Sequence, residues 1–153
     1  MDLVQHLVDH HVDSLTAIID AASGLDDTVL DAPIEQSVEG IDDDPTLRSV
    51  LNAMVTQEEH WLSALRGGDW PDESDKSVAG LAARHDAAGR DYREMVARAI
   101  SDDALADTFV DTTCGPPTTH SLGGTIGHVI TFAAVRRTLA VIVGGGAGRR
   151  ARS

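Results

Sequence analysis

Residues 44–68 read DPTLRSVLNAMVTQEEHWLSALRGG, and this stretch decides the fold. Asp44 is a typical helix N-cap, and Pro45 suits the first helical position, where its missing amide hydrogen removes no helical hydrogen bond. The pair Gly67–Gly68 marks the far end. Between these signals the apolar residues recur at helical spacing and share one face: Leu47, Val50, Leu51, Met54, Trp61 and Leu65. We therefore predict an amphipathic helix that buries this face.

Three further stretches repeat this helical period. The first covers residues 2–22 and includes His11 in its apolar stripe. The next begins near Ser77, and Arg and Asp residues occupy its opposite side, as is typical of a solvated face. The last covers about 121–143, and Gly144–Gly146 are expected to end it. Because this last helix is apolar nearly all round, we expect it to be the inner helix of a bundle.

The composition favours helices over sheets. Aromatic residues make up 3% of the chain, and no sustained alternation of apolar and polar residues indicates a strand. The connections at about 23–44 and 101–120 are long for helix hairpins, so we expect them to wrap the bundle ends or to include short turns and strands. We predict an all-α four-helix bundle with long inter-helix loops. It forms one domain over residues 1–146, followed by a flexible, arginine-rich tail over 147–153.

Charge divides the chain unevenly. Its 12 basic and 25 acidic residues give a net charge of −13. All the acids lie in residues 1–111, which carry a net charge of −18, whereas residues 112–153 carry five arginines and no acid. Either the last helix is mostly buried and needs no acids, or this cationic segment packs against the acidic part within the chain or across a dimer. The overall negative field would repel phosphates and anionic lipids, so we expect no nucleic acid and no membrane as partner.

Other signals indicate a cytoplasmic protein. The lone Cys114 cannot form an intramolecular disulfide, and no nearby cation makes its thiol reactive. The first basic residue is Arg48, so the N-terminus lacks the positive region of a signal peptide. The last helix is long enough to cross a membrane, but His128 and the pair Arg136–Arg137 would make that costly.

Seven histidines raise the question of a metal site, because imidazole is a common ligand of transition metals. His11 and His128 are expected on the inward faces of two different helices, either as hydrogen-bonded core residues or as ligands. A metal site built from His10 or His11 with Glu59, His60 and His128 requires that these positions converge. Four histidines are expected at the surface or in loops: His6, His10, His85 and His120.

An inward-facing arginine needs a carboxylate, since an unpaired buried charge is costly. Arg136 lies in the last helix, and Glu59 in the second helix is its expected partner. Such a pair either fixes the register of two helices or forms an anion-binding pocket at the guanidinium.

Three stretches of the chain resemble the DinB/YfiT-like family of four-helix bundles, and the likeness covers almost the whole sequence. They are residues 46–68, SVAGLAARHDAA at residues 77–88, and THSLGGTIGHVITFAAVRRTLAVIVGGGAG at residues 119–148. In that family a divalent metal, commonly nickel or zinc, is held by one histidine of the second helix and two of the last, in a pattern like HVxxHxxxHR. Some members are thiol S-transferases or isomerases that use bacillithiol or mycothiol, and members often pair as homodimers.

The family's metal ligands are replaced in this chain. The ligand positions hold Ala53, Phe132 and Arg136, and neither hydrocarbon nor a guanidinium can donate an electron pair to a metal. The resemblance therefore implies a lost metal site, where Arg136 supplies a fixed positive charge and Phe132 fills volume. Other positions of the pattern are kept, namely Glu59, Trp61, His128, Val129 and Arg137.

These observations predict a metal-free relative that binds a small anionic or amphipathic molecule, or that acts by protein association as a homodimer. No catalytic residue is identified. The alternative is a metal-dependent thiol S-transferase or isomerase of the bacillithiol or mycothiol type, with its metal displaced toward His128 and the histidines of the first helix. The expected ligand pocket has six members: His11, Glu59, Trp61, His128, Phe132 and Arg136.

Overall fold

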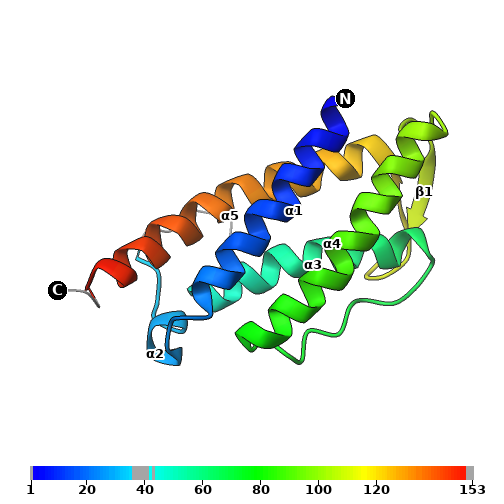
Figure 1. The fold of residues 1–153 in the computed structure, drawn as a ribbon. Helices are drawn as coiled ribbons and strands as arrows, with labels where there is room; N and C mark the ends of the chain where they lie inside the picture. Colours follow the sequence, from blue (N-terminus) through cyan, green and yellow to red (C-terminus); the bar gives the residue numbers. More distant parts are fainter. Residues whose placement is uncertain (1, 36–41, 43, 151–153) are drawn as a thin grey trace.

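Four long helices dominate the computed structural model, which describes residues 2–35, 42 and 44–150. They are α1 (Leu3–Ala22), α3 (Leu47–Leu65), α4 (Val78–Ser101) and α5 (Leu122–Arg150) (Figure 1). The short helix α2 (Asp27–Leu30) lies in the first long connection, and strands β1 (Thr108–Asp111) and β2 (Thr118–Ser121) lie in the second. The prediction of a mostly helical chain with four long helices is confirmed.

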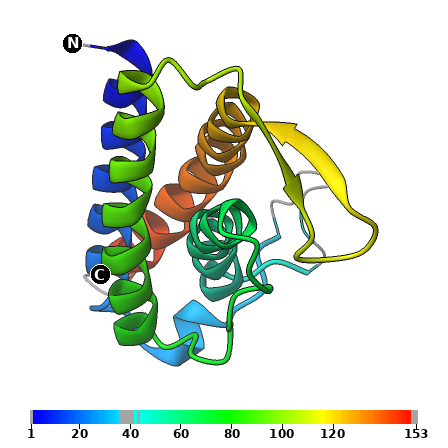
Figure 2. The ribbon, with the colours of Figure 1, turned by 90° about the vertical axis from the view of Figure 1, so that its right-hand side faces the viewer.

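The long helices pack side by side. Helix α1 packs against α4 and α5, and α3 packs against the same two helices. Figure 2 shows α1 and α4 on one flank of the molecule and the strands on the other. The strands form an antiparallel hairpin that pairs Thr108 with Ser121 and Asp111 with Thr118. Strand β1 contacts α3 and β2 contacts α5, so the hairpin covers one end of these two helices.

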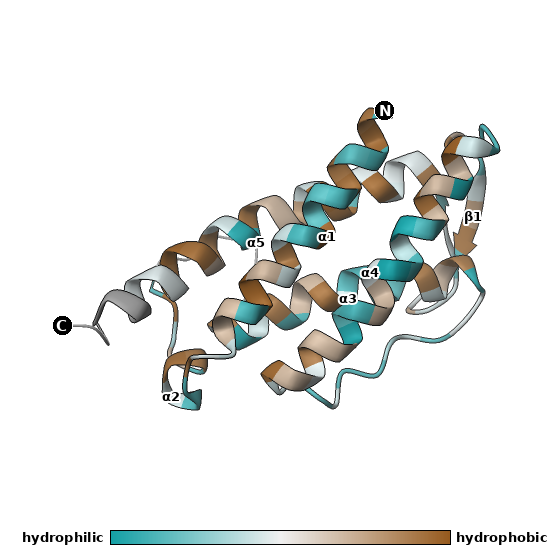
Figure 3. Ribbon diagram, viewed as in Figure 1, coloured by the Kyte–Doolittle hydropathy of each residue, from teal (hydrophilic) through white to brown (hydrophobic). Residues whose placement is uncertain are grey.

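The core has two apolar clusters, one toward each end of the helices. One contains Leu15, Leu51 and Leu81, together with residues that line the α2 connection. The other surrounds Tyr92 and includes Trp61. Figure 3 shows hydrophilic and hydrophobic residues alternating along α1 and α4, as the helical period requires.

The start of α3 differs from the prediction that placed its N-cap at Asp44. The N-cap is Thr46, whose side chain accepts a hydrogen bond from the Ser49 amide while the Ser49 hydroxyl accepts one from the Thr46 amide. Asp44 has a φ of 46°, a left-handed conformation that turns the chain before the helix begins. Pro45 precedes the helix, and its carbonyl accepts a hydrogen bond from Ile34. A reciprocal cap therefore takes precedence over the Asp–Pro signal.

The end of α5 is also different, because the helix continues through Gly144–Gly146 to Arg150. Nothing lies within 4 Å of a Cβ built on any of these three glycines, so no packing contact requires glycine there. A glycine inside a helix costs only about 1 kcal/mol, and no proline follows to stop the helix. The first part of the predicted tail is thus helical, and residues 151–153 lie outside the described residues.

Helix α5 is packed on one side only, so the expectation of a mostly buried inner helix is wrong. Only 28% of the most apolar window of this helix is buried within the protein. By length and composition alone, Leu122–Gly146 is also long and apolar enough to cross a membrane. Its exposed side chains include Val135, Val141 and Ile142, which are 42%, 58% and 57% exposed. The opposite side packs on α1 and α3. One face of α5 is therefore left uncovered within the described chain.

Candidate functional site

A buried carboxylate joins three helices at the centre of the protein. Glu58 of α3 is fully buried, and its two oxygens contact His11 of α1 and His85 of α4. The distances are 2.9 Å from His11 Nε2 to Glu58 Oε1 and 2.8 Å from His85 Nδ1 to Glu58 Oε2. The prediction that His11 points inward is correct. The prediction that His85 is solvated is wrong, because only 1% of it is exposed.

The contacts of this trio indicate that His85 carries a positive charge. Its Nδ1 faces the carboxylate of Glu58, and its Nε2 lies 3.1 Å from the carbonyl oxygen of Val12. Nε2 also lies 3.0 Å from the hydroxyl oxygen of Thr16, whose hydrogen is donated to the Val12 carbonyl, so every neighbour of the ring accepts and both ring nitrogens donate. Burial alone would lower the pKa of His85, but the hydrogen bond and charge of Glu58 raise it above its ordinary value. The pKa of Glu58 is lowered, because the two histidines outweigh the effect of burial.

Glu59 does not pair with Arg136, contrary to the prediction. Its carboxylate lies 2.6 Å from Nη2 of Arg84 on α4. Arg84 also donates to the side-chain oxygens of Asn52 and Thr56, at 2.8 and 3.1 Å. Because a helix presents successive side chains to different neighbours, Glu58 points into the core and Glu59 points toward α4. Of the six expected pocket residues, Glu59 and His11 thus belong to other clusters.

The other four expected residues form a row along α3 and α5. Trp61 of α3 lies next to His128 of α5, with ring centroids 6.0 Å apart. His128 lies next to Phe132, at 5.8 Å. The guanidinium carbon of Arg136 sits 3.4 Å from the centroid of the Phe132 ring, within cation–π range. His128 is exposed, which corrects its expected inward position, because it lies on the uncovered side of α5.

Arg136 is buried and has an acidic neighbour from the connection before α3. Its Nη2 donates to Asp42 Oδ1 at 3.0 Å, and its Nη1 donates to the carbonyl oxygen of Phe132 at 3.3 Å. The second oxygen of Asp42 is buried without a hydrogen-bond partner among the described residues. A carboxylate of the chain itself therefore occupies the anion position at the guanidinium.

A second histidine–carboxylate pair lies beside Trp61. His60 is 7% exposed, and its Nε2 lies 3.2 Å from Asp111 Oδ2 and 2.9 Å from Thr113 Oγ1. Its ring centroid lies 4.5 Å from that of Trp61 and 4.6 Å from that of Trp70. Burial lowers the pKa of His60 and outweighs the opposing effect of Asp111, and His120 and His128 lower it further. His60 is therefore neutral near pH 7.

Four of the five aromatic residues of the chain gather at this place, with three of its seven histidines. Strand residues complete the group: His120 packs edge-on against Trp61 at 5.0 Å and lies 6.0 Å from Phe109. We call this group the aromatic face; it comprises His60, Trp61, Trp70, Phe109, His120, His128 and Phe132. Most of the aromatic rings of the chain therefore pack together where α3, α5 and the hairpin meet.

The residues considered for a displaced metal site do not converge. His11 binds Glu58, Glu59 binds Arg84, and His60 binds Asp111, while His128 contacts aromatic rings. His10 is exposed on α1. Among the residues that the structure describes, no group of three or more His, Cys, Asp or Glu side chains has an arrangement that could hold a metal ion.

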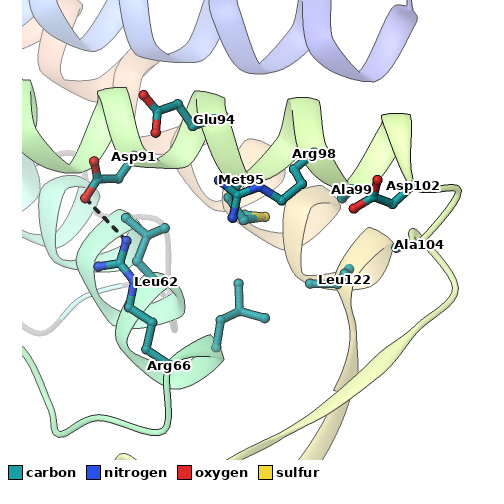
Figure 4. A pocket seen from close by; sticks show the side chains of 11 residues that line it. Leu62, Arg66, Asp91, Glu94, Met95, Arg98, Ala99, Asp102, Ala104 and Leu122 are labelled. Atoms are coloured by element: carbon teal, nitrogen blue, oxygen red, sulfur yellow. Dashed lines mark hydrogen bonds and ion pairs between the residues drawn. The ribbon is translucent and has the colours of Figure 1, made fainter.

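A separate cleft of about 290 Å³ lies between α3, α4 and the start of α5 (Figure 4). Its walls carry both signs of charge, and Arg66 pairs with Asp91 across it at 3.4 Å. Leu62, Met95 and Leu122 supply apolar surface. None of the six expected pocket residues lines this cleft, and no described side chain there is both buried and without a partner.

Sequence reasoning did not show that Glu58 and His85 are buried partners. Glu58 stands beside Glu59, and His85, which stands between Arg84 and Asp86, was expected at the surface. The helical period offered a signal: His85 lies four residues after Leu81 and seven before Tyr92, on the buried face of α4. His60 was considered, but its partner Asp111 lies on a strand that composition did not predict.

Comparisons with protein-family models, with curated proteins and with solved structures found no match to this chain.

Proposed function

We propose that this protein binds a small amphipathic molecule, with a planar apolar body and an anionic group, along the aromatic face. The observation that carries this proposal is the row Trp61–His128–Phe132–Arg136, in which ring surfaces lead to a guanidinium. Rings offer stacking surface to a planar body, and a guanidinium binds carboxylate or sulfonate oxygens. The resemblance to the DinB/YfiT-like family supports the same location, because Phe132 and Arg136 stand at the family's ligand positions.

Asp42 has a defined part in this proposal. Its carboxylate binds Arg136 at 3.0 Å and would be exchanged for the anionic group of the ligand. The exchange replaces one charged contact by another, so the guanidinium keeps a partner before and after binding. The carboxylate of Asp42 therefore competes with the anionic group of the ligand, and removing this carboxylate should favour ligand binding.

The first test uses 1-anilinonaphthalene-8-sulfonate, a planar aromatic anion whose fluorescence reports binding. We expect Arg136→Met to weaken its binding by about tenfold, the loss of one charge-assisted contact. Asp42→Asn should strengthen binding by about three- to tenfold, because an amide competes less well than a carboxylate for the guanidinium. Fluorescence titration of the folded variants measures both changes.

The matched control is Arg137→Met, which removes the adjacent arginine of the same helix. N-phenyl-1-naphthylamine, which lacks the sulfonate, is the control ligand, and Arg136→Met should leave its binding within about twofold. The proposal would be contradicted if the two arginine substitutions weakened sulfonate binding equally. It would also be contradicted if Asp42→Asn did not bind the sulfonate more tightly than the wild type. Far-UV circular dichroism of each variant checks that the probe is not reporting unfolding.

We also propose that α5 pairs with α5 of a second copy of the chain, which gives a homodimer. The uncovered face of α5 presents Val135, Val141 and Ile142, and exposed apolar patches of this kind commonly mark association sites. A second copy suits this face because the exposed Val135, Val141 and Ile142 are uncharged aliphatic side chains, so two copies can bury them against each other.

Light scattering coupled to size-exclusion chromatography tests the dimer. We expect a mass of twice the 16.2 kDa of one chain for the wild type. Val141→Glu combined with Ile142→Glu should give the monomer, because two charges would be buried in an apolar contact. Val110→Glu is the control, since Val110 is 51% exposed but belongs to β1 and not to α5. A monomeric wild type, or loss of the dimer in the control, would contradict the proposal.

A further inference from the structure

The imidazole of His60 has one nitrogen, Nδ1, without a hydrogen-bond partner among the described residues. The other nitrogen, Nε2, contacts the carboxylate of Asp111 and the hydroxyl of Thr113. Thr113 donates its own hydrogen to Asp111 Oδ1 at 2.6 Å, so its oxygen is free to accept from His60. Hydrogen bonds and the nearby imidazole outweigh burial and lower the pKa of Asp111, which keeps it an ionised acceptor. Both neighbours therefore accept, and Nε2 carries the hydrogen.

The lone pair of neutral His60 then lies on Nδ1. This atom is buried and has no hydrogen-bond partner among the described residues. A buried nitrogen without a partner is costly, and such atoms are few in folded proteins. An acceptor held in place by Asp111 and Thr113 but left without a donor is arranged to receive one from outside the chain.

Trp70 is the exposed member of the rings around His60. It is 43% exposed, whereas Trp61 is 7% exposed and fixed in α3. Trp70 lies in the connection between α3 and α4, and its indole nitrogen donates to Glu73 at 3.0 Å. A planar ligand could take the place of the indole against the imidazole, exchanging one stacking contact for another.

We infer that His60 is the hydrogen-bond acceptor of the ligand site, and that the ligand is a planar aromatic molecule whose hydroxyl group donates to Nδ1 after its ring replaces Trp70. This inference rests on the proposed function for the place of the ligand, but it does not require the anion site at Arg136. Asp111 is a positioning residue, because it holds the proton on Nε2 and so keeps the lone pair on Nδ1.

Long-range ¹H–¹⁵N NMR of the imidazoles tests the assignment in the free protein. At pH 7 we expect neutral His60 with its hydrogen on Nε2. Asp111→Asn should move the hydrogen to Nδ1, because the amide can donate to Nε2. A hydrogen on Nδ1 in the wild type would overturn the inference, whatever the protein binds.

Calorimetric binding of 2-naphthol and 2-methoxynaphthalene tests the ligand class. We expect the wild type to bind the hydroxyl compound about three- to tenfold more tightly, as one hydrogen bond to a buried acceptor requires. His60→Phe should abolish this preference while keeping a ring in place. His10→Phe is the control and should preserve it, since His10 is exposed on α1 and lies outside the aromatic face.

A preference that is absent in the wild type, or that survives in His60→Phe, would overturn the inference. Neither naphthalene carries an anionic group, so Arg136→Met should not change their relative affinities. If the preference for naphthol holds but Arg136→Met does not weaken sulfonate binding, only the anion site at Arg136 is refuted. Trp70→Ala should strengthen naphthol binding, and weaker binding there would contradict the exchange of rings.

Discussion

Replacing Glu58 by alanine is expected to lower the free energy of unfolding by about 3–5 kcal/mol. The substitution removes the carboxylate that stabilises protonated His85 in the core and the acceptor of His11, so His85 must lose its proton or remain a buried, unpaired charge. It also opens a cavity, since Glu58 is fully buried. For a domain of this size, each kcal/mol shifts the melting temperature by roughly 2–4 °C. The expected loss is a large share of the 5–15 kcal/mol, roughly, that stabilises a typical domain.

Urea unfolding followed by circular dichroism measures this loss. The informative comparison is the triple substitution of Glu58, His11 and His85 by leucine, which removes every charge together. Replacing a complete buried ionic set by apolar residues is often neutral or stabilising, so the triple variant should be more stable than Glu58→Ala. A loss below about 1 kcal/mol in Glu58→Ala would show that the trio is not a stabilising unit.

The second large expected effect is a stability maximum near pH 6.5. The pKa of His85 is raised above 6.5 in the folded protein, so its stabilising contribution is complete below pH 6.5 and is lost as the pH rises through the folded pKa. The pKa of Glu58 is lowered below 4.5, so its contribution is present above pH 4.5 and is lost as the pH falls through the folded pKa.

His60 acts in the opposite sense to His85. Because its folded pKa lies below 6.5, stability decreases as the pH falls from 6.5 toward that value. Asp111, His120 and His128 are the titratable groups that face it. The free energy of unfolding therefore has its maximum between the pH range in which His60 titrates and the range in which His85 titrates. Each slope is limited to about 1.4 kcal/mol per pH unit for one proton.

Unfolding curves recorded from pH 4 to 9, roughly the span over which these groups titrate, measure the effect. His85→Gln should remove the decline on the alkaline side, and His10→Gln should leave it unchanged because His10 is exposed. NMR titration of His85 in the wild type is a second readout that does not depend on a variant. An alkaline decline that persists in His85→Gln would assign it to another group.

The helices could be predicted from the sequence because periodicity and capping signals are local. Helix α4 begins at Val78, close to the predicted start near Ser77, and α1 begins and ends within a residue of its expected limits. The misplaced end of α5 has a physical reason, since glycine weakens a helix without forbidding it. The hairpin could not be predicted in detail, because its pairing depends on contacts with α3 and α5 rather than on alternation within four-residue strands.

The site was predicted only in part, because side-chain partners depend on which helices are neighbours. Arg136, Phe132, His128 and Trp61 follow one another at helical spacing or across one helix pair, so their row was accessible to sequence reasoning. The partner of Glu59 was not, because α4 and α5 both lie beside α3 and the sequence does not distinguish them. The packing of α3 against α4 decides that Glu59 pairs with Arg84 and not with Arg136.

The Glu58 trio has a mechanical consequence for the whole molecule. Its residues belong to α1, α3 and α4, and a slip of one helical turn, about 5.4 Å, between any of these helices would separate the nitrogens from the carboxylate. Helix α5 contributes no residue to this trio. The trio thus fixes the register of three helices, while the register of α5, which carries His128, Phe132 and Arg136, depends on its packing against α1 and α3.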